Sequence, residues 1–204
     1  DIGKRKMLIT AEGGPDRYAI FSRSTGRIYW EGKKYDPETN KITSSDAPHV
    51  RSATRETPQG VVYGTSNRSA DIWAFDVRTE TLQSLGSGAV ATSEYVTSID
   101  ADPTGRYLYY VPGAHGGSER DGSAVVQFDV KEKTRKAIAF LTPFYRDKYG
   151  YTPCGTFSTA VSPEGDKLYV TWNGNRAGRD DRGRLPWDTC ALTVIHIPES
   201  ERQH

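Results

Sequence analysis

Three segments of the chain alternate hydrophobic and polar residues around a Pro-x-Gly turn. In each one, an apolar stretch leads into the turn and an alternating stretch leads out of it, over residues 52–63, 97–109 and 157–170. Proline presets φ for a tight turn, and glycine supplies the positive φ that the hairpin needs. A weaker copy over residues 18–30 keeps the glycine and lacks the proline. Each copy therefore predicts the first two antiparallel strands of a repeated unit.

A second hairpin follows in all units but the last. Residues 35–42, 75–82 and 128–137 share an aromatic residue at the end of one strand, Asp and Thr at the turn, and an apolar residue in the next strand. Asp and Thr side chains hydrogen-bond the backbone of such turns, so these segments predict the third and fourth strands. In the last unit, residues 191–197 predict a third strand, but the polar residues 199–202 predict no fourth one.

The repetition of one four-strand order predicts the fold. Helical signals are nearly absent, because no capped segment has an amphipathic period of 3.6 residues. Short strands can also build a sandwich, but an ordered four-strand repeat favours a β-propeller, in which each unit is one blade. We therefore predict a single all-β domain over residues 1–204, an array of about four four-stranded antiparallel blades. The approximate limits of the blades are residues 17–45, 49–86, 94–141 and 154–197, with a further strand at residues 4–10.

The strand at residues 4–10 allows more than one way for the ring to close. Residues 1–10 read like the end of a third strand followed by a fourth, so this strand could complete the last blade or belong to a preceding one. Wider rings are commoner than four-bladed ones among propellers. Self-association of two chains to complete a ring, or a longer propeller of which this chain is a part, are the remaining alternatives.

The repeats resemble those of the β-propeller superfamily. The likeness is clearest at residues 162–170, whose sequence Ser-Pro-Glu-Gly-Asp-Lys-Leu-Tyr-Val is similar to bacterial propeller repeats of the YVTN-like, senescence-marker-like and TolB-like groups. It extends over residues 18–197. The resemblance implies the fold but no particular activity, because propellers include both binding proteins and enzymes.

Composition narrows the classes of partner. The chain has 204 residues, of which 35% are hydrophobic and 26% charged, and its formal net charge is +1. This balance argues against a general polyanion binder, so we expect no nucleic-acid partner. No apolar run approaches the roughly 20 residues of a membrane-spanning helix, so we expect no membrane span.

Three long inserts fall on one rim of the predicted propeller, over residues 112–123, 142–153 and 173–189. Loops of this length are usually functional or disordered. The second and third inserts are rich in aromatic residues, which stack on sugars, and in arginine, which holds carboxylates and sulfates. We expect this rim to bind a protein partner or an anionic, carbohydrate-like ligand. The candidate ligand-binding residues on these inserts are Tyr145, Tyr149, Tyr151, Arg176, Arg179 and Trp187.

A less specific interpretation of the same inserts stays open. Asp180, Asp181 and Asp188 lie among the arginines and could neutralise them within the loop. The aromatic residues would then pack beneath the loops and bind no ligand.

A second candidate site lies at the propeller axis. When the blades are aligned on their turn prolines, His49, Glu94 and Cys154 occupy one rung, and Arg51 follows His49 on the same strand. Equivalent rungs converge on the axis, so His49 and Glu94 could bind a divalent metal or act as an acid–base pair, with Cys154 as a weaker third ligand. Arg51 there joins the candidate ligand-binding residues. Alternatively, His49 caps the loop after Pro48 and Glu94 is a solvated strand end.

These two candidate sites correspond to two classes of function. The rim residues predict a binding module. The axial pair predicts a metal-dependent propeller enzyme, either a lactonase-like hydrolase or a polysaccharide lyase. No diagnostic catalytic motif accompanies the axial pair, so no catalytic residue is assigned and binding is favoured.

The two cysteines bear on the cellular compartment. Cys154 opens the first strand of the last unit and Cys190 opens its third, which places them about 10 Å apart across the second strand. A disulfide needs Cα atoms within about 7 Å, so the flanking loops would have to lean together. A disulfide would indicate an exported protein, and on this basis we expect a periplasmic or secreted location. The alternative is two small buried side chains.

Overall fold

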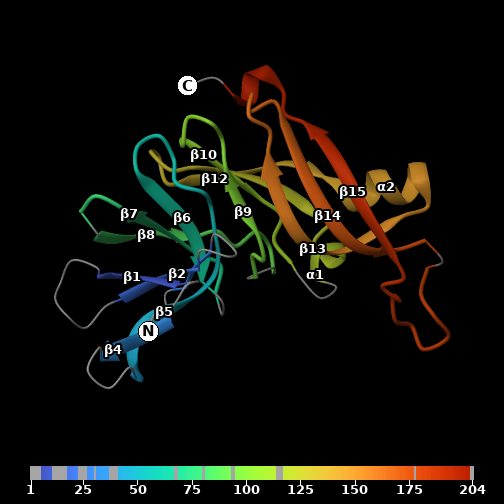
Figure 1. Ribbon diagram of the computed structural model, residues 1–204. Coiled ribbons are helices and arrows are strands. Elements are labelled where there is room, and N and C mark those ends of the chain that lie inside the picture. The colour runs from blue at the N-terminus through green and yellow to red at the C-terminus, as the bar shows by residue number, and fades with distance from the viewer. Residues whose placement is uncertain are drawn as a thin grey trace.

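The computed structural model is nearly all-β, with antiparallel sheets and few helices (Figure 1). It describes residues 6–10, 18–22, 27–29, 31–36, 41–66, 69–79, 81–92, 95–113, 117–176 and 178–202, with side chains from residue 51 onward. The elements in chain order are β1 (Lys6–Thr10), β2 (Tyr18–Ser22), β3 (Arg27–Tyr29), β4 (Glu31–Asp36), β5 (Lys41–Ala53), β6 (Val61–Ser66), β7 (Asp71–Asp76), β8 (Thr81–Ser87), β9 (Ile99–Ala101), β10 (Tyr107–Tyr110), α1 (Gly117–Arg120), β11 (Ala124–Asp129), β12 (Thr134–Phe140), α2 (Leu141–Tyr149), β13 (Thr152–Val161), β14 (Lys167–Asn175), β15 (Thr189–His196) and the 3₁₀ helix η1 (Glu199–Glu201). None of the helices in these ranges is long and apolar enough to cross a membrane.

The turns have the geometry that the sequence predicts. Gly60, Gly105 and Gly165 follow their turn prolines with positive φ values of 77°, 74° and 72°. Each glycine N–H donates a hydrogen bond back across the turn, at 2.8–2.9 Å. In the second hairpins, Asp76 and Asp129 each accept two backbone N–H groups of the turn that follows, at 2.8–3.1 Å. These bonds hold the pKa of the Asp76 carboxyl below its usual value, so both aspartates serve as turn caps.

The strands form sheets in chain order: β1–β2–β3, β4–β5–β6–β7–β8, β9–β10–β11–β12 and β13–β14–β15. The predicted all-β, propeller-like array of antiparallel sheets is confirmed, although the sheets contain three, five, four and three strands and not four each. The difference arises at the 13-residue strand β5, which pairs with β4 over its first part and with β6 over its last. The N-terminal strand β1 pairs with β2.

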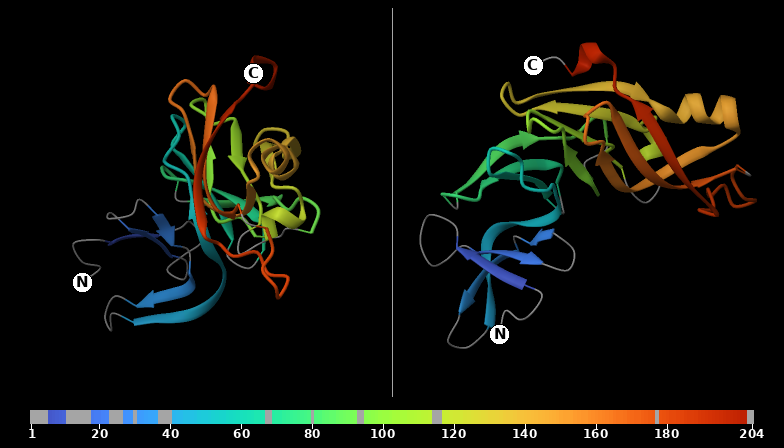
Figure 2. Two further views of the ribbon diagram at one scale, coloured as in Figure 1. Left: turned by 90° about the vertical axis from the view of Figure 1, so that its right-hand side faces the viewer. Right: turned by 45° about the horizontal axis from the view of Figure 1, so that its top comes forward.

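Hydroxyl groups link three successive sheets near β6, β9 and β13. Thr65 Oγ1 donates a hydrogen bond to the carbonyl of Val96, just before β9, at 3.1 Å. Thr97 Oγ1 donates in turn to the carbonyl of Thr156 on β13, at 3.0 Å. Figures 1 and 2 show the sheets that contain β6–β8, β9–β12 and β13–β15 following one another in chain order. These inner hydroxyl bonds therefore lie where successive sheets meet.

Two hydrophobic clusters fill the spaces between these sheets. Leu108 and Tyr110 of β10 belong to the cluster that also contains Ile72 of β7. Tyr107 and Tyr109, on the opposite face of β10, belong to the cluster that contains Trp172 of β14. All four residues of β10 are buried, as expected for a strand covered on both faces.

The insert at residues 142–153, predicted as a loop, begins with helix α2 and ends in β13. The helix ends at Gly150, whose left-handed conformation lets its N–H bond to the carbonyl of Arg146 at 3.0 Å. Its start lacks a sequence signal, because Phe140 at the N-cap has no side-chain hydrogen bond to offer. The aromatic residues expected on a loop therefore project from a helix that lies beside β15 (Figure 2).

Candidate functional site

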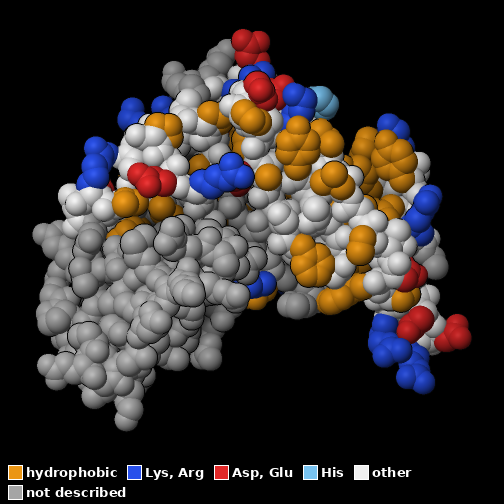
Figure 3. Space-filling model, in the orientation of Figure 1, with side chains coloured by type: hydrophobic (Ala, Val, Ile, Leu, Met, Phe, Trp, Pro, Cys, Tyr) orange, Lys and Arg blue, Asp and Glu red, His pale blue; other side chains and the backbone are white. Residues whose placement is uncertain are grey.

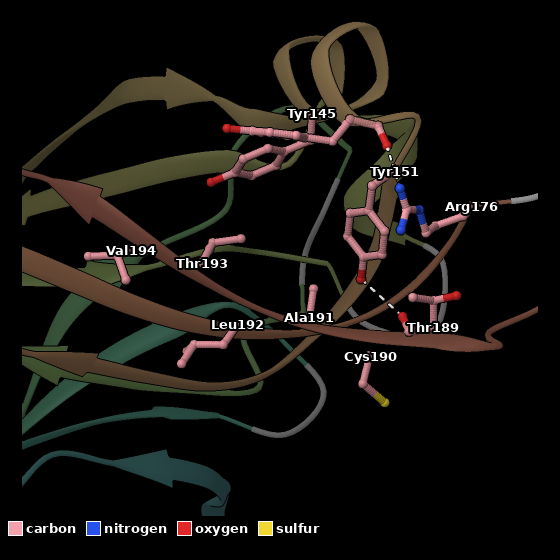
Figure 4. Close-up of a pocket in the computed structure, with 10 residues that line it drawn as sticks. Tyr145, Tyr151, Arg176, Thr189, Cys190, Ala191, Leu192, Thr193 and Val194 are labelled. Atoms are coloured by element: carbon pink, nitrogen blue, oxygen red, sulfur yellow. Dashed lines mark hydrogen bonds between the residues drawn. The ribbon is translucent and has the colours of Figure 1, made fainter.

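A groove of about 450 Å³ lies between helix α2 and strand β15 (Figure 4). It brings together four of the residues predicted from the sequence, namely Tyr145, Tyr149, Tyr151 and Arg176. The opposite wall is a continuous stretch of β15, residues 189–194. We call this site the α2–β15 groove.

The α2 wall is an aromatic cluster. Tyr145 and Tyr149 stand one helical turn apart, with ring centroids 5.9 Å from each other. Phe144 packs edge-on against both rings, at 5.4 and 6.2 Å. Lys148 Nζ lies 5.2 Å from the centroids of the Phe144 and Tyr149 rings, within cation–π range. Because Phe144 and Tyr149 are 52% and 49% exposed, the cluster presents an open aromatic surface.

Tyr151 forms the base of the groove and fixes the position of β15. It is buried, and its hydroxyl donates a hydrogen bond to the carbonyl of Thr189 at 3.1 Å. Gly174 on β14 makes room for this ring, since a Cβ there would lie 2.2 Å from the Tyr151 Oη. Burial raises the pKa of Tyr151, so the hydroxyl stays neutral and serves as a donor.

Arg176 gives one end of the groove a positive charge. Its Nη2 donates a long hydrogen bond of 3.4 Å to the carbonyl of Tyr149, which leaves the other N–H groups of the guanidinium available (Figure 4). In the described part of the chain, no carboxylate lies within ion-pairing distance of Arg176, and no Asp or Glu lines the groove. A carboxylate or sulfate on a ligand would find its counter-charge here.

The other predicted ligand-binding residues lie elsewhere. Arg179 forms an ion pair with Glu119 of α1 at 3.2 Å and donates to the carbonyl of Gly183. Arg51 and Trp187 line a separate small cavity that also includes Thr156 of β13. The Arg51 guanidinium lies 5.2 Å from the centroid of the Tyr95 ring there. The predicted ligand-binding residues are therefore divided among three places.

The alternative of internal neutralisation applies to the tip of the last insert. Asp180 forms an ion pair with Arg184 at 3.1 Å. Asp188 accepts hydrogen bonds from the Asn175 amide at 3.3 Å. These contacts order the loop without reaching Arg176, whose charge stays directed at the groove.

The predicted metal pair falls outside the described side chains. His49 lies in β5 opposite Glu31, but its side chain and all of Glu94 are not among the described residues. Where side chains are described, no group of three or more His, Cys, Asp or Glu could hold a metal ion. The site that pairs His49 with Glu94 stays a prediction.

The two cysteines are free thiols. Gly155 of β13, Asn173 of β14 and Cys190 of β15 lie opposite one another in the sheet, so β14 separates the two cysteines as the sequence predicts. Cys154 is buried and donates a weak hydrogen bond to the carbonyl of Thr152, whereas Cys190 is exposed. The disulfide that would have indicated export is absent from this pair.

Sequence reasoning missed the β15 wall of the groove. The signal for it is that the polar residues 199–202 predict no further strand, and among the described residues no strand pairs with β15 beyond β14. In the described part of the chain, β15 is therefore the last strand of its sheet.

Comparisons with known proteins bear on the fold alone. No family model matches the chain, and no curated protein matches it. Among solved structures, it is similar to the hydrazine synthase of Kuenenia stuttgartiensis (TM-score 0.46, 15% identity, 93% of this chain and 48% of the other). It is also similar to the tricorn protease (TM-score 0.48, 15% identity, 91% of this chain and 17% of the other). A chain of the nidogen/laminin complex is similar as well (TM-score 0.47, 12% identity, 83% of this chain and 58% of the other). The chain thus spans less than two thirds of the length of each of these proteins.

Proposed function

We propose that this protein is a binding module and that the α2–β15 groove binds a segment of a protein partner. The observation that supports this most is the combination of exposed aromatic rings on α2 with an open strand on the facing wall. Aromatic residues and arginine are enriched in protein interfaces, and both occur here without a set of catalytic groups.

Exposed hydrophobic side chains around the groove support the same proposal. Leu192 and Val194 of β15, which line the groove, are 63% and 47% exposed. Figure 3 shows hydrophobic side chains gathered over the region of β13–β15 and α2. A contiguous patch of this kind on a protein surface usually marks a site of interaction.

Charge indicates the kind of partner. Arg176 and Lys148 border the groove, and no acidic residue lines it. An acidic segment would therefore bind faster and with greater selectivity than a basic one.

An anionic saccharide is the second candidate ligand. The half-exposed ring of Tyr149 beside Arg176 matches the pairing of an aromatic face with a cation that sulfated or carboxylated sugars need. A heparin-derived hexasaccharide tests this alternative by titration.

Selection from a phage-displayed library of random dodecapeptides tests the proposal. We expect acidic peptides with apolar residues to be enriched, and we expect Tyr149→Ala and Arg176→Glu each to weaken their binding about tenfold or more. Matched controls are Phe157→Ala and Arg182→Glu, which remove an exposed aromatic ring and an exposed charge outside the groove. Failure to enrich any peptide that responds to the two groove variants would discard the protein-binding proposal.

A further inference from the structure

The α2–β15 groove follows the edge of a strand. Neighbouring side chains of a strand point to opposite faces of its sheet, yet the groove is lined by every residue from 189 to 194. Figure 4 shows Ala191 and Thr193 pointing toward the tyrosines, whereas Cys190 and Leu192 point away. A cavity that touches both sets runs along the backbone of β15.

The register of β15 identifies the backbone groups at this edge. Ile197 N–H donates to the carbonyl of Asp166 at 2.8 Å, and the pairing with β14 continues without a register shift to Thr189. Hydrogen-bonded pairs alternate along an antiparallel ladder, so the odd-numbered residues of β15 bond to β14. The N–H and C=O groups of Cys190, Leu192 and Val194 therefore face outward.

The described residues after β15 do not cover this edge. After β15 the chain enters η1, where the carbonyl of Glu201 accepts a hydrogen bond from Gln127 and its carboxylate forms an ion pair with Lys136. Both contacts tie η1 to the preceding sheet. Within the described ranges, no strand other than β14 pairs with β15.

The edge of β15 also lacks the features that protect sheet edges. In the preceding sheet, the edge strand β12 carries Arg135 and Lys136, and its pairing with β11 shifts register between Val125 and Val126. β15 has the sequence Thr-Cys-Ala-Leu-Thr-Val-Ile-His, without Lys, Arg or Pro, and its register is unbroken. Charged residues and bulges normally prevent edge pairing, so β15 is suited to accept another strand.

We propose that the groove binds its partner by β-strand addition: an extended segment of the partner protein pairs antiparallel with β15. This inference rests on the proposed function of protein binding. The added strand would occupy the fourth position of its sheet, as β12 does in the sheet β9–β12. Backbone hydrogen bonds supply the affinity in this mode of recognition, and side-chain contacts supply the specificity.

The geometry specifies the chemistry of the added strand. Alternate side chains would face Tyr145 and Ala191 and would therefore be apolar. An antiparallel strand ends beside Thr189, where Arg176 lies (Figure 4). We infer that the partner segment carries a carboxylate at its C-terminal end, from a side chain or from the chain terminus.

A peptide derived from β12 tests strand addition directly. The probe is acetylated Thr-Glu-Gln-Ala-Ile-Ala-Phe, the β12 sequence with Arg135→Glu and Lys136→Gln, followed by aspartate with a free carboxylate. Two further versions are N-methylated on alternate residues, one on the odd and one on the even positions. Only one edge of an added strand faces β15, so we expect one version to bind at least about tenfold more weakly than the probe and the other to bind nearly as well.

Amide hydrogen exchange of the protein gives the second measurement. Bound probe should slow exchange at Leu192 and Val194 by about tenfold or more, because these N–H groups face outward, and should leave Ala191 and Thr193 unchanged. If the two methylated peptides bind equally well and the Leu192 N–H gains no protection from exchange, strand addition is overturned. The groove would then remain a binding site. Strand addition would also be overturned if the phage selection finds groove-dependent peptides but the probe does not bind at millimolar concentration.

A second copy of the chain is an alternative occupant of this edge. Two β15 edges could pair about a two-fold axis. A concentration-dependent dimer, detected by light scattering and abolished by Val194→Pro, would assign the edge to self-association and overturn the proposal. A monomer at all concentrations is the result we expect.

Discussion

Strands β10 and β15 occupy comparable sheets and have opposite surroundings. The residues of β10 are all buried, because a sheet covers each of its faces. The residues of β15 alternate between partly buried and exposed, because only one face of this strand contacts a neighbouring sheet. The comparison shows that one repeated strand pattern yields core where two sheets cover the strand and a half-exposed strand where, among the described residues, one sheet does.

The largest expected effect is the difference in stability lost when a leucine is truncated on β10 and when one is truncated on β15. Leu108→Ala removes a fully buried side chain and should lower the free energy of unfolding by about 2–5 kcal/mol. Leu192→Ala truncates a side chain that is 63% exposed and should change it by less than about 0.5 kcal/mol. Urea denaturation measures both variants. Equal losses would contradict the assignment of β15 as an open strand.

A smaller effect is expected at the contact that positions β15. In Gly174→Ala, the new Cβ would lie 2.2 Å from the Tyr151 Oη and 2.6 Å from the carbonyl of Thr152, so the ring must move. We expect a loss of about 1–3 kcal/mol in thermal or urea unfolding, together with weaker peptide binding. The control Tyr151→Phe removes only the hydrogen bond to Thr189 and should cost about 1 kcal/mol. If Gly174→Ala leaves the free energy of unfolding unchanged, the Tyr151 ring has room to shift.

Local signals explain which parts of the fold the sequence predicted. The turns at Gly60, Gly105 and Gly165 depend on proline and positive-φ glycine, which are properties of three or four adjacent residues. Helix α2 was missed because it has no N-terminal cap and depends on packing against the last sheet. Propensity is a weak guide where tertiary contacts decide.

The candidate site was predicted in part for a similar reason. The tyrosines near residues 145–151 and Arg176 meet because Thr152 and Asn175, the residues next to them in the chain, pair where β13 meets β14. Arg179 is held away by Glu119, a long-range ion pair that no sequence pattern encodes. The β15 wall depends on which strands pair with β15, and among the described residues only β14 does. The residues of β15 themselves do not record this pairing.

Thiol chemistry sharpens the comparison between buried and open positions. Burial raises the pKa of Cys154 to about 11, so this thiol stays protonated in the folded protein through pH 9. Iodoacetamide at pH 8 should label exposed Cys190 and leave Cys154 unmodified, as read by peptide mass spectrometry. Because the thiol of the unfolded chain ionises first, stability should fall as pH rises from about 9 toward 11. Rapid labelling of Cys154 would contradict its burial.

The smallest expected signal concerns the predicted axial pair. If His49 and Glu94 hold a divalent metal, elemental analysis should find it in the purified protein and should find less in His49→Ala. Chelation should then lower the melting temperature of the original protein and leave the variant unaffected. Metal-free protein that binds no added zinc would discard the pair and the metal-dependent enzyme alternative with it.

The inner hydroxyl bonds have a mechanical consequence. The hydroxyl groups of Thr65 and Thr97 link three successive sheets, and further hydrogen bonds, such as the one from Thr159 N–H to the Ser98 hydroxyl, join the same sheets. A force that pulls the chain ends apart would load these links in series with the hydrophobic clusters between sheets, so no sheet could peel away without exposing its neighbour. Extension of a single molecule should therefore show one cooperative rupture from β6 to β15 and not a staircase of separate sheets.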